Sequence, residues 1–390
     1  MGRALNQRWF AVGRSNREDA ERAGREAGAE ARSNGVPKLA VIFASCEYEL
    51  DSLLGGIRKE LGDTPLIGCS TAGEIATAGP GDASVVVAAM GGDGLEVATG
   101  VGLETSTRLR QAGEEAARCI ADASGPHRAL LMLTDGLSGD QQEIVRGAYS
   151  VVGAGVPLVG GCAGDGLEMK KTFQLYGDEV LSDAVVAAAI ASDAPLGIGV
   201  RHGWRRVGEP MLVTRSEDNR VYEIDGRPAL DVYLERLEVP DDARQDTPEF
   251  TAFSSTHPLG LASRGEEHHV RFISGADFEE GALVCIAEVP QGGLVWTMEG
   301  DANSVLQATE GACEDALASL DGAPPAGLLA FDCIARRGVL GDEGIKDEID
   351  RIAERGGNAP VAGFYTYGEI ARTRGIAGFH NQTLVILAVA

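Results

Sequence analysis

The stretch PLIGCSTAGEI at residues 65–75 returns near the end of the chain as PVAGFYTYGEI at 360–370, and a shorter version, PLVGGCAGD, stands at 157–165. Each version begins with proline and two apolar residues, passes through glycine, and reaches a second glycine followed by an acidic residue. Proline limits the backbone where a buried strand begins, and glycine permits the tight turn that ends it. The three stretches therefore predict three strands, each followed by a turn that displays polar side chains at the end of a sheet.

The sequence around the three stretches is also similar, and such self-similarity predicts an internal repeat. Apolar runs precede them at 41–46, 130–135 and 328–333, and further apolar runs follow them at 84–89, 184–189 and 383–388. A helix fits between run and stretch, because Ile345, Ile349 and Ile352 have the spacing of one helical face. Upstream of each unit we expect another strand and a long helix.

The chain therefore predicts three units of the form β-α-β-α-β-turn-β at residues 9–91, 95–191 and 294–390, with the third opening on a strand at 294–297. The predicted fold class is α/β, in which mixed β-sheets are flanked by helices and each unit shares its sheet with a neighbour. We further expect the glycine turns to lie close together around a shared cleft.

The pattern of the units breaks between residues 192 and 293. This insert contains a predicted hairpin, 211–214 with 221–224, and then Pro228, which favours the start of a helix. We expect a first domain at 1–224, with two units and the hairpin. A second domain at 225–390 would contain the remaining insert and the third unit.

Charge and cysteine content limit the expected partners and the compartment. The net charge is -25 and the isoelectric point is near 4.6, so the chain repels nucleic acid and anionic membranes. Seven cysteines without a Cys-x-x-Cys pair are typical of a reducing compartment. The chain begins without a secretory signal and has no uncharged apolar run of about 18 residues. These features predict a cytoplasmic protein.

The turns offer the groups that a small zwitterionic ligand requires. Backbone N–H groups and hydroxyls of the first turn are suited to a carboxylate, an arginine after the 328–333 run is a candidate clamp for it, and the acidic residues suit an ammonium group. The candidate ligand-binding residues are Cys69, Ser70, Thr71, Glu74, Asp165, Arg336, Tyr365, Tyr367 and Glu369. The alternative is structural, because an acid after a turn glycine often caps a helix or accepts an internal hydrogen bond.

Two other classes of function remain open. An enzyme with a cysteine nucleophile would use Cys69, Cys162 or Cys333 near strand ends, but no histidine lies near them in sequence, and a buried thiol is the simpler interpretation. An interaction module would use Tyr365 and Tyr367 as anchors, either in a homodimer or against a signalling protein.

Six segments together resemble the FIST family: GCSTAGEI at 68–75, VYEIDGRPALDVYLERL at 221–237, THPLG at 256–260, FDCIARRGVLG at 331–341, GFYTYGEIA at 363–371 and FHNQT at 379–383. The resemblance implies an N-type domain followed by a C-type domain. It also implies an intracellular sensory module that binds a small, amino acid-like ligand without turnover. Such a module passes its state to a partner such as a separate kinase.

Some bacterial members of that family are similar to haem-binding nitric oxide sensors, so haem is an alternative cofactor. A haem needs a proximal ligand beside an apolar slot. His202, His257 and His380 are the candidates because they lie in predicted loops or strand entrances. The chain has no Cys-x-x-Cys-His sequence, which excludes covalent attachment of the c type.

Overall fold

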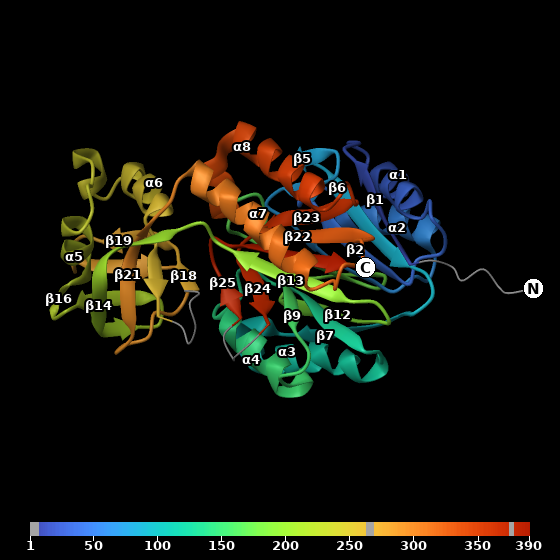
Figure 1. Cartoon of the computed structure of the whole chain (residues 1–390), viewed down its shortest axis with the longest axis horizontal. Coiled ribbons are helices and arrows are strands. Elements are labelled where there is room, and N and C mark those ends of the chain that lie inside the picture. The colour runs from blue at the N-terminus through green and yellow to red at the C-terminus, as the bar shows by residue number, and fades with distance from the viewer. Residues whose placement is uncertain (1–7, 263–268, 374–377) are drawn as a thin grey trace, which may run out of the picture.

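The computed structural model describes residues 8–262, 269–373 and 378–390. Three six-stranded sheets form one part of the molecule, which we call the body and which comprises the described residues up to 201 and from 302 onward. An eight-stranded sheet forms the insert lobe at 205–299, at the left of Figure 1. The predicted α/β fold with mixed sheets flanked by helices is confirmed.

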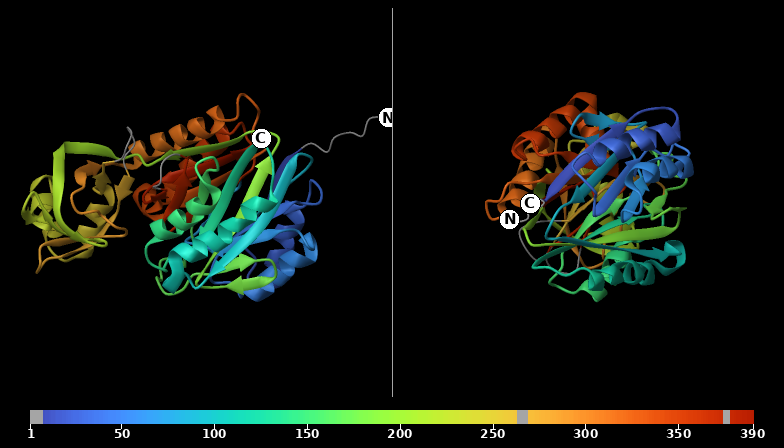
Figure 2. Two further views of the ribbon diagram at one scale, coloured as in Figure 1. Left: turned by 90° about the horizontal axis from the view of Figure 1, so that it is seen from below. Right: turned by 90° about the vertical axis from the view of Figure 1, so that its right-hand side faces the viewer.

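The three sheets of the body are each covered on the outside by a pair of helices, as the end-on view in Figure 2 shows. The first sheet contains, in spatial order, β1 (Trp9–Ser15), β6 (Val85–Gly91), β2 (Leu39–Ala44), β3 (Leu66–Ser70), β10 (Gln174–Tyr176) and β11 (Glu179–Leu181), with α1 (Ala20–Ala31) and α2 (Leu50–Leu61). The second contains β25 (Phe379–His380), β24 (Glu369–Arg372), β9 (Leu158–Cys162), β8 (His127–Thr134), β12 (Ala184–Ser192) and β7 (Leu95–Leu103), with α3 (Thr105–Ala117) and α4 (Gln141–Val152). The third contains β13 (Leu196–Arg201), β26 (Leu384–Val389), β22 (Gly327–Cys333), β23 (Val361–Thr366), β4 (Glu74–Ala76) and β5 (Gly79–Gly81), with α7 (Ala302–Ala318) and α8 (Ile334–Arg355).

The insert lobe is built on a long bent hairpin. Its strands are β14 (Arg205–Glu217), β15 (Arg220–Ile224), β16 (Arg227–Pro228), β17 (Leu259–Leu261), β18 (His269–Arg271), β19 (Ile273–Asp277), β20 (Ala282–Cys285) and β21 (Leu294–Glu299), with helices α5 (Ala229–Glu235) and α6 (Pro248–Thr256). The predicted hairpin is confirmed, because Val213 pairs with Ile224 across β14 and β15. The helix expected after Pro228 is α5.

The hairpin that follows each glycine turn leaves its own sheet and completes a neighbouring one. The hairpin β4–β5 follows β3 but pairs with β23 of the third sheet, and β10–β11 follows β9 but pairs with β3 of the first. The hairpin β24–β25 follows β23 but pairs with β9 of the second sheet. The exchange is therefore cyclic, and every sheet contains strands from at least two segments of the chain.

One expected strand lies in a different sheet. The strand predicted at 294–297 is present as β21, but its expected place at the start of the third unit is wrong, because it pairs with β14 and β17 in the insert lobe. Strand β13 takes the edge beside β26 instead. Its glycines let α7 lie directly on the sheet, since a Cβ on Gly199 would stand 1.8 Å from the Ala312 carbonyl oxygen.

The repeated glycine of the three stretches has a packing reason. A Cβ on Gly363 in β23 would stand 1.9 Å from the carbonyl oxygen of Ala330 in β22, and a Cβ on Gly160 would stand 1.9 Å from that of Met132. The central strands lie too close at these points for any side chain. The inner faces of the three sheets then enclose one apolar core, at whose centre the rings of Phe43 and Phe364 stack 5.0 Å apart.

Candidate functional site

The glycine turns lie close together, as expected, but they touch one another directly. The Ala72 amide donates to the Tyr365 carbonyl at 3.1 Å, and the Tyr365 amide donates to the Gly73 carbonyl at 2.8 Å. The Gly164 amide donates to the Ser70 carbonyl at 3.0 Å, which joins the second turn to the first. Main-chain hydrogen bonds therefore occupy the place where a shared cleft was expected.

Most of the candidate ligand-binding residues are buried in these contacts. The Ser70 hydroxyl donates to the Gly164 carbonyl at 2.7 Å and accepts from the Phe173 amide at 2.9 Å. The Thr71 hydroxyl contacts the Glu74 carboxyl at 2.5 Å. Cys69 is fully buried in the apolar core.

Glu74 and Glu369 have similar surroundings in two of the exchanged strands. Glu74 accepts from the Ser84 hydroxyl at 2.6 Å, and Glu369 accepts from the Thr383 amide at 3.1 Å. Burial raises the pKa of each carboxyl to about 8, although these hydrogen bonds lower it. Gln174 occupies the corresponding first position of the third exchanged strand, β10. A neutral side chain therefore suits this position.

Arg336 lies in a buried ionic cluster and not at a cleft. Its guanidinium donates to Asp332 at 2.6 Å, to Glu348 at 2.5 Å and to the His202 carbonyl at 3.0 Å. Its side chain is 0% exposed. The carboxylate-clamp role finds no support in this geometry, because every nitrogen of the guanidinium already donates to an internal partner.

Tyr365 and Tyr367 face different surroundings. The Tyr365 ring lies under the Arg337 guanidinium, 4.9 Å from it, and is fully buried. The Tyr367 hydroxyl donates to the Asp165 carboxylate and accepts from the Leu167 amide at 2.8 Å. Of the nine candidates, Tyr367 alone lines the pocket described next.

Asp165 organises the loop beside that pocket. Burial by itself would raise its pKa, but hydrogen bonds from Tyr367 and from the amides of Lys170, Lys171 and Met169 lower the pKa overall. The amide of Lys170 lies 2.6 Å from the carboxylate. The Tyr367–Asp165 pair thereby fixes a loop that exposes Leu167 and Met169, which are 60% and 58% accessible.

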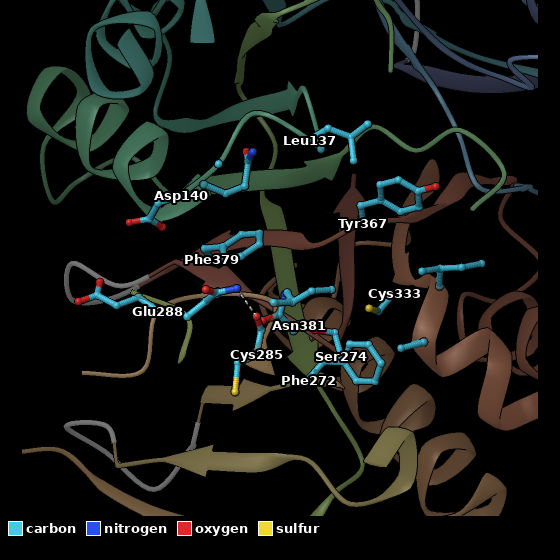
Figure 3. Close-up of a pocket in the computed structure, with 18 of the residues that line it drawn as sticks. Leu137, Asp140, Phe272, Ser274, Cys285, Glu288, Cys333, Tyr367, Phe379 and Asn381 are labelled. Atoms are coloured by element: carbon cyan, nitrogen blue, oxygen red, sulfur yellow. Dashed lines mark hydrogen bonds between the residues drawn. The ribbon is translucent and has the colours of Figure 1, made fainter. Parts of the chain in front are cut away.

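A pocket of about 910 Å³ lies between the body and the insert lobe (Figure 3). The body contributes Leu137, Asp140, Leu167, Tyr367, Phe379 and Asn381. The insert lobe contributes Asn219, Phe272, Ser274, Cys285, Ile286 and Glu288. The last residue of β22, Cys333, and the first two residues of α8 complete the wall. Pockets of this size and mainly apolar lining are typical of small-molecule sites.

Asn381 is the notable polar group of this pocket. Its side chain is 1% exposed, and neither its amide nitrogen nor its amide oxygen has a hydrogen-bond partner among the described residues. An unpaired buried polar group costs about 1–3 kcal/mol, so such groups call for a partner that the chain itself does not supply. Phe379, two residues earlier, lines the same wall.

The charged groups of the pocket are acidic. Asp140, Asp218 and Glu288 line it, and Asp140 also caps α4 by accepting from the Gln142 amide at 2.9 Å. Among the described lining residues there is no lysine, arginine or histidine. The local charge therefore disfavours an anionic ligand.

The three cysteines considered as nucleophiles are all buried. Burial raises the pKa of Cys69, Cys162 and Cys333 well above the ordinary thiol value. Cys333 lines the pocket and is 5% exposed. A thiol that remains protonated at neutral pH is a poor nucleophile.

The three histidines considered for haem have local partners and do not line the pocket. His380 contacts the Ala371 carbonyl at 2.9 Å, and burial lowers its pKa to about 4. The His257 ring stacks 4.1 Å from Phe253, and the His202 ring accepts from the Trp204 amide at 3.0 Å. None of the three is therefore placed to serve as a proximal haem ligand at this pocket.

Neither a metal-binding cluster nor a membrane-spanning helix is present among the described residues. No group of three His, Cys, Asp or Glu residues is placed to hold a metal ion in the described part of the chain. Within the same residues, each helix is too short or too polar to cross a membrane.

Apart from Tyr367 and Cys333, sequence reasoning did not single out the pocket residues. Asn381 lies in the FHNQT segment at 379–383, which was noted for its resemblance and not for its chemistry. The available signal was a polar pair, Asn381 and Gln382, which stands shortly before the apolar strand β26. The other lining residues come from separate turns whose approach depends on the fold.

Comparison with curated proteins gives relatives without an assigned function. Over 389 residues the chain is 28% identical to the uncharacterized proteins MT0656 and Rv0628c of Mycobacterium tuberculosis, covering 95% of this chain and 97% of each relative. An 82-residue segment is 35% identical to the uncharacterized protein MJ1623 of Methanocaldococcus jannaschii, which is 21% of this chain and 16% of that protein. Among solved structures, T. maritima PurL complexed with ATP matches with a TM-score of 0.22 at 10% identity, over 97% of this chain and 71% of that one, too weakly to carry an argument.

Two family models match nearly the whole chain. The FIST N domain matches residues 38–227, and the FIST C domain matches residues 229–372. FIST domains are generally small-ligand sensory modules in signal transduction. The chain therefore belongs to the FIST family.

Proposed function

We propose that this protein senses a small molecule by binding it, without turnover, in the pocket between the body and the insert lobe. The observation that carries the proposal is the buried carboxamide of Asn381, whose two polar atoms lack partners in a pocket of about 910 Å³. A ligand that supplies those partners gains binding energy that the unliganded chain leaves unused. The sensory character of FIST domains supports the same interpretation.

The amino acid-like ligand expected from the sequence fits this pocket less well than a neutral or cationic one. Its carboxylate would lie among Asp140, Asp218 and Glu288 without a lysine or arginine among the described lining residues. An ammonium group would be favoured there, since opposite charges attract most strongly where water is partly excluded.

Ligand binding would change the position of the insert lobe relative to the body, and a partner protein would respond to that change. The chain passes between body and insert lobe twice, at 202–204 and 300–301, and each passage contains a glycine. Gly203 has a φ of 92°, and a Cβ on Gly300 would stand 3.2 Å from the Gly203 carbonyl oxygen. A ligand that touches both walls favours the arrangement in which the walls are closest. A separate kinase or other signalling protein would read that arrangement.

A thermal-shift screen of neutral and cationic metabolites tests the proposal. A ligand that binds the native state raises the melting temperature, by an amount that grows with ligand concentration. We expect hits to stabilise the wild type but not the Ser274→Trp variant, in which an indole fills the pocket from the exposed edge of β19.

Thr251→Trp is the matched control, because Thr251 is an exposed residue of α6 that does not line the pocket. Hits that stabilise the Ser274→Trp and Thr251→Trp variants equally would contradict the assignment of the site. Mass spectrometry of the recovered ligand tests the absence of turnover, since a chemically changed ligand would indicate an enzyme.

A further inference from the structure

The unpaired carboxamide of Asn381 restricts the chemistry of the ligand. A carboxamide presents one acceptor and two donors in a single plane. Both kinds of atom lack partners here, so the complementary group must offer a donor and an acceptor side by side. Asparagine makes such a paired contact with the edge of adenine, and amides and lactams present the same arrangement.

Aromatic side chains line the same pocket. Phe272 comes from the insert lobe, whereas Phe379 and Tyr367 come from the body (Figure 3). Proteins bind unstacked bases by placing aromatic rings on their faces and polar side chains at their edges. The pocket combines aromatic rings with a polar side chain, and the Asn381 carboxamide would bond to the edge of the base.

The negative charge of the pocket favours a neutral base over a nucleotide, which carries a phosphate. Asp140, Asp218 and Glu288 line the pocket, and the whole chain has a net charge of -25. A phosphate placed here would meet like charge without a lysine or arginine among the described lining residues. A neutral ring or its neutral nucleoside meets no such penalty.

We infer that the ligand is a neutral planar heterocycle of the nucleobase type, whose hydrogen-bonding edge pairs with the Asn381 carboxamide between aromatic side chains. This inference rests on the proposed function, because it names the ligand class of the same pocket. The volume of about 910 Å³ accommodates a nucleoside as well as a free base.

Calorimetric titration of the full chain tests the ligand class directly. The probes are adenine, hypoxanthine, uracil and nicotinamide, then adenosine against AMP, with leucine and lysine as amino acids. We expect at least one base or nicotinamide to bind, and AMP to bind more weakly than adenosine. For each base that binds, the Asn381→Leu variant weakens binding about tenfold or more, the size of a lost paired edge contact.

Two further measurements keep the test independent of protein folding. If adenine binds, N6,N6-dimethyladenine, which lacks the exocyclic donor, should bind the wild type about tenfold more weakly or worse. Asn381→Asp keeps the shape of the side chain, and its carboxyl has no donor once it is ionised. Because burial raises the pKa of a carboxyl, binding is measured at rising pH, and at the highest pH this variant should bind as weakly as Asn381→Leu. Asn34→Leu is the control, because Asn34 is exposed and does not line the pocket.

The outcomes distinguish the ligand class from the proposed function. Base binding that is unchanged by both Asn381 variants, or by methylation of adenine, would overturn the inference. Failure of every base and of nicotinamide to bind would also overturn it. In that event, hits of another class that Ser274→Trp abolishes would leave the proposed function standing, whereas the absence of such hits would remove both.

Discussion

Gly363 shows at the residue scale why the repeated stretch requires glycine at this position. The prediction concerns Gly363→Ala, whose new Cβ would stand 1.9 Å from the Ala330 carbonyl oxygen between two buried strands. Neither strand can move without disturbing the core, so we expect a loss of about 3 kcal/mol or more in the free energy of unfolding. Chemical denaturation measures it.

The control for this substitution is Gly338→Ala in α8. Gly338 is exposed and a Cβ there meets no atom within 4 Å. Alanine should raise the free energy of unfolding by up to about 1 kcal/mol, because it favours the helix. Equal effects of the two substitutions would show that close strand packing is not the reason for Gly363.

The buried acids Glu74 and Glu369 predict a dependence of stability on pH. Their pKa values of about 8 in the folded chain lie above the ordinary value of 4.5. The folded state therefore retains protons that the unfolded state releases. The stability that these groups contribute is complete below about pH 4.5 and is lost as pH rises to about 8, by about 1.4 kcal/mol per pH unit for each group.

The measurement is the melting temperature of Glu74→Gln and Glu369→Gln between pH 5 and 9, compared with the wild type. Each substitution imitates Gln174 in the third exchanged strand. We expect each variant to lose less stability than the wild type between pH 5 and 8. Parallel curves for wild type and variants would mean that the two acids are ionised in the folded state.

Helix α8 shows how one element is held together by a buried ionic cluster. The helix is broken at Gly341, where φ is 65° and ψ is -178°. Arg336 lies before the break and donates to Glu348 after it, at 2.5 Å. The ion pair therefore joins the two segments of the helix.

We predict that Arg336→Met costs about 3–5 kcal/mol in the free energy of unfolding, because it leaves Asp332 and Glu348 buried without their cation. Arg355→Met is the control on the same helix. Its salt bridges to Glu310 and Glu314 are partly exposed, so its loss should cost at most about 1 kcal/mol. Urea titration of both variants compares the costs, and a cost below about 1 kcal/mol for Arg336→Met would contradict the buried-pair argument.

The helices and strands were easier to predict from the sequence than the pairing of the strands in the sheets. The spacing of Ile345, Ile349 and Ile352 identified α8, and a continuous apolar run identified β22, which is buried along its whole length. These patterns could not show that β4 pairs with β23, since hydrogen bonds between strands form equally well with any free edge. The pocket could not be predicted from sequence for the same reason, because Asn381 and Phe272 are brought together only by the position of the insert lobe.

At the scale of the whole molecule, the cyclic exchange of hairpins makes the three sheets depend on one another. The Thr77 hydroxyl accepts from the Val361 amide at 2.8 Å, and Thr77→Val removes it. We predict that this substitution lowers the free energy of opening measured by hydrogen exchange by about 1 kcal/mol. Because the sheets share strands, the loss should appear in β3 and β9 as well as in β23.

Ser216→Ala is the comparison for that experiment. Its hydroxyl donates to the Val289 carbonyl at 2.7 Å within the insert lobe. We expect it to lower protection in β14 and β15 and to leave the body unchanged. If Thr77→Val affected the third sheet alone, the sheets would open separately and the exchange would not couple them.

The exchanged hairpins also bear on whether the chain can be divided. A cut between residues 226 and 227 would leave β4 and β5 on one fragment and their partner β23 on the other, while β9 would be parted from β24. Each fragment alone would expose unpaired strand edges and tend to precipitate. When the two fragments are refolded together, they should form one soluble complex, because each fragment contains edge strands that complete the sheets of the other.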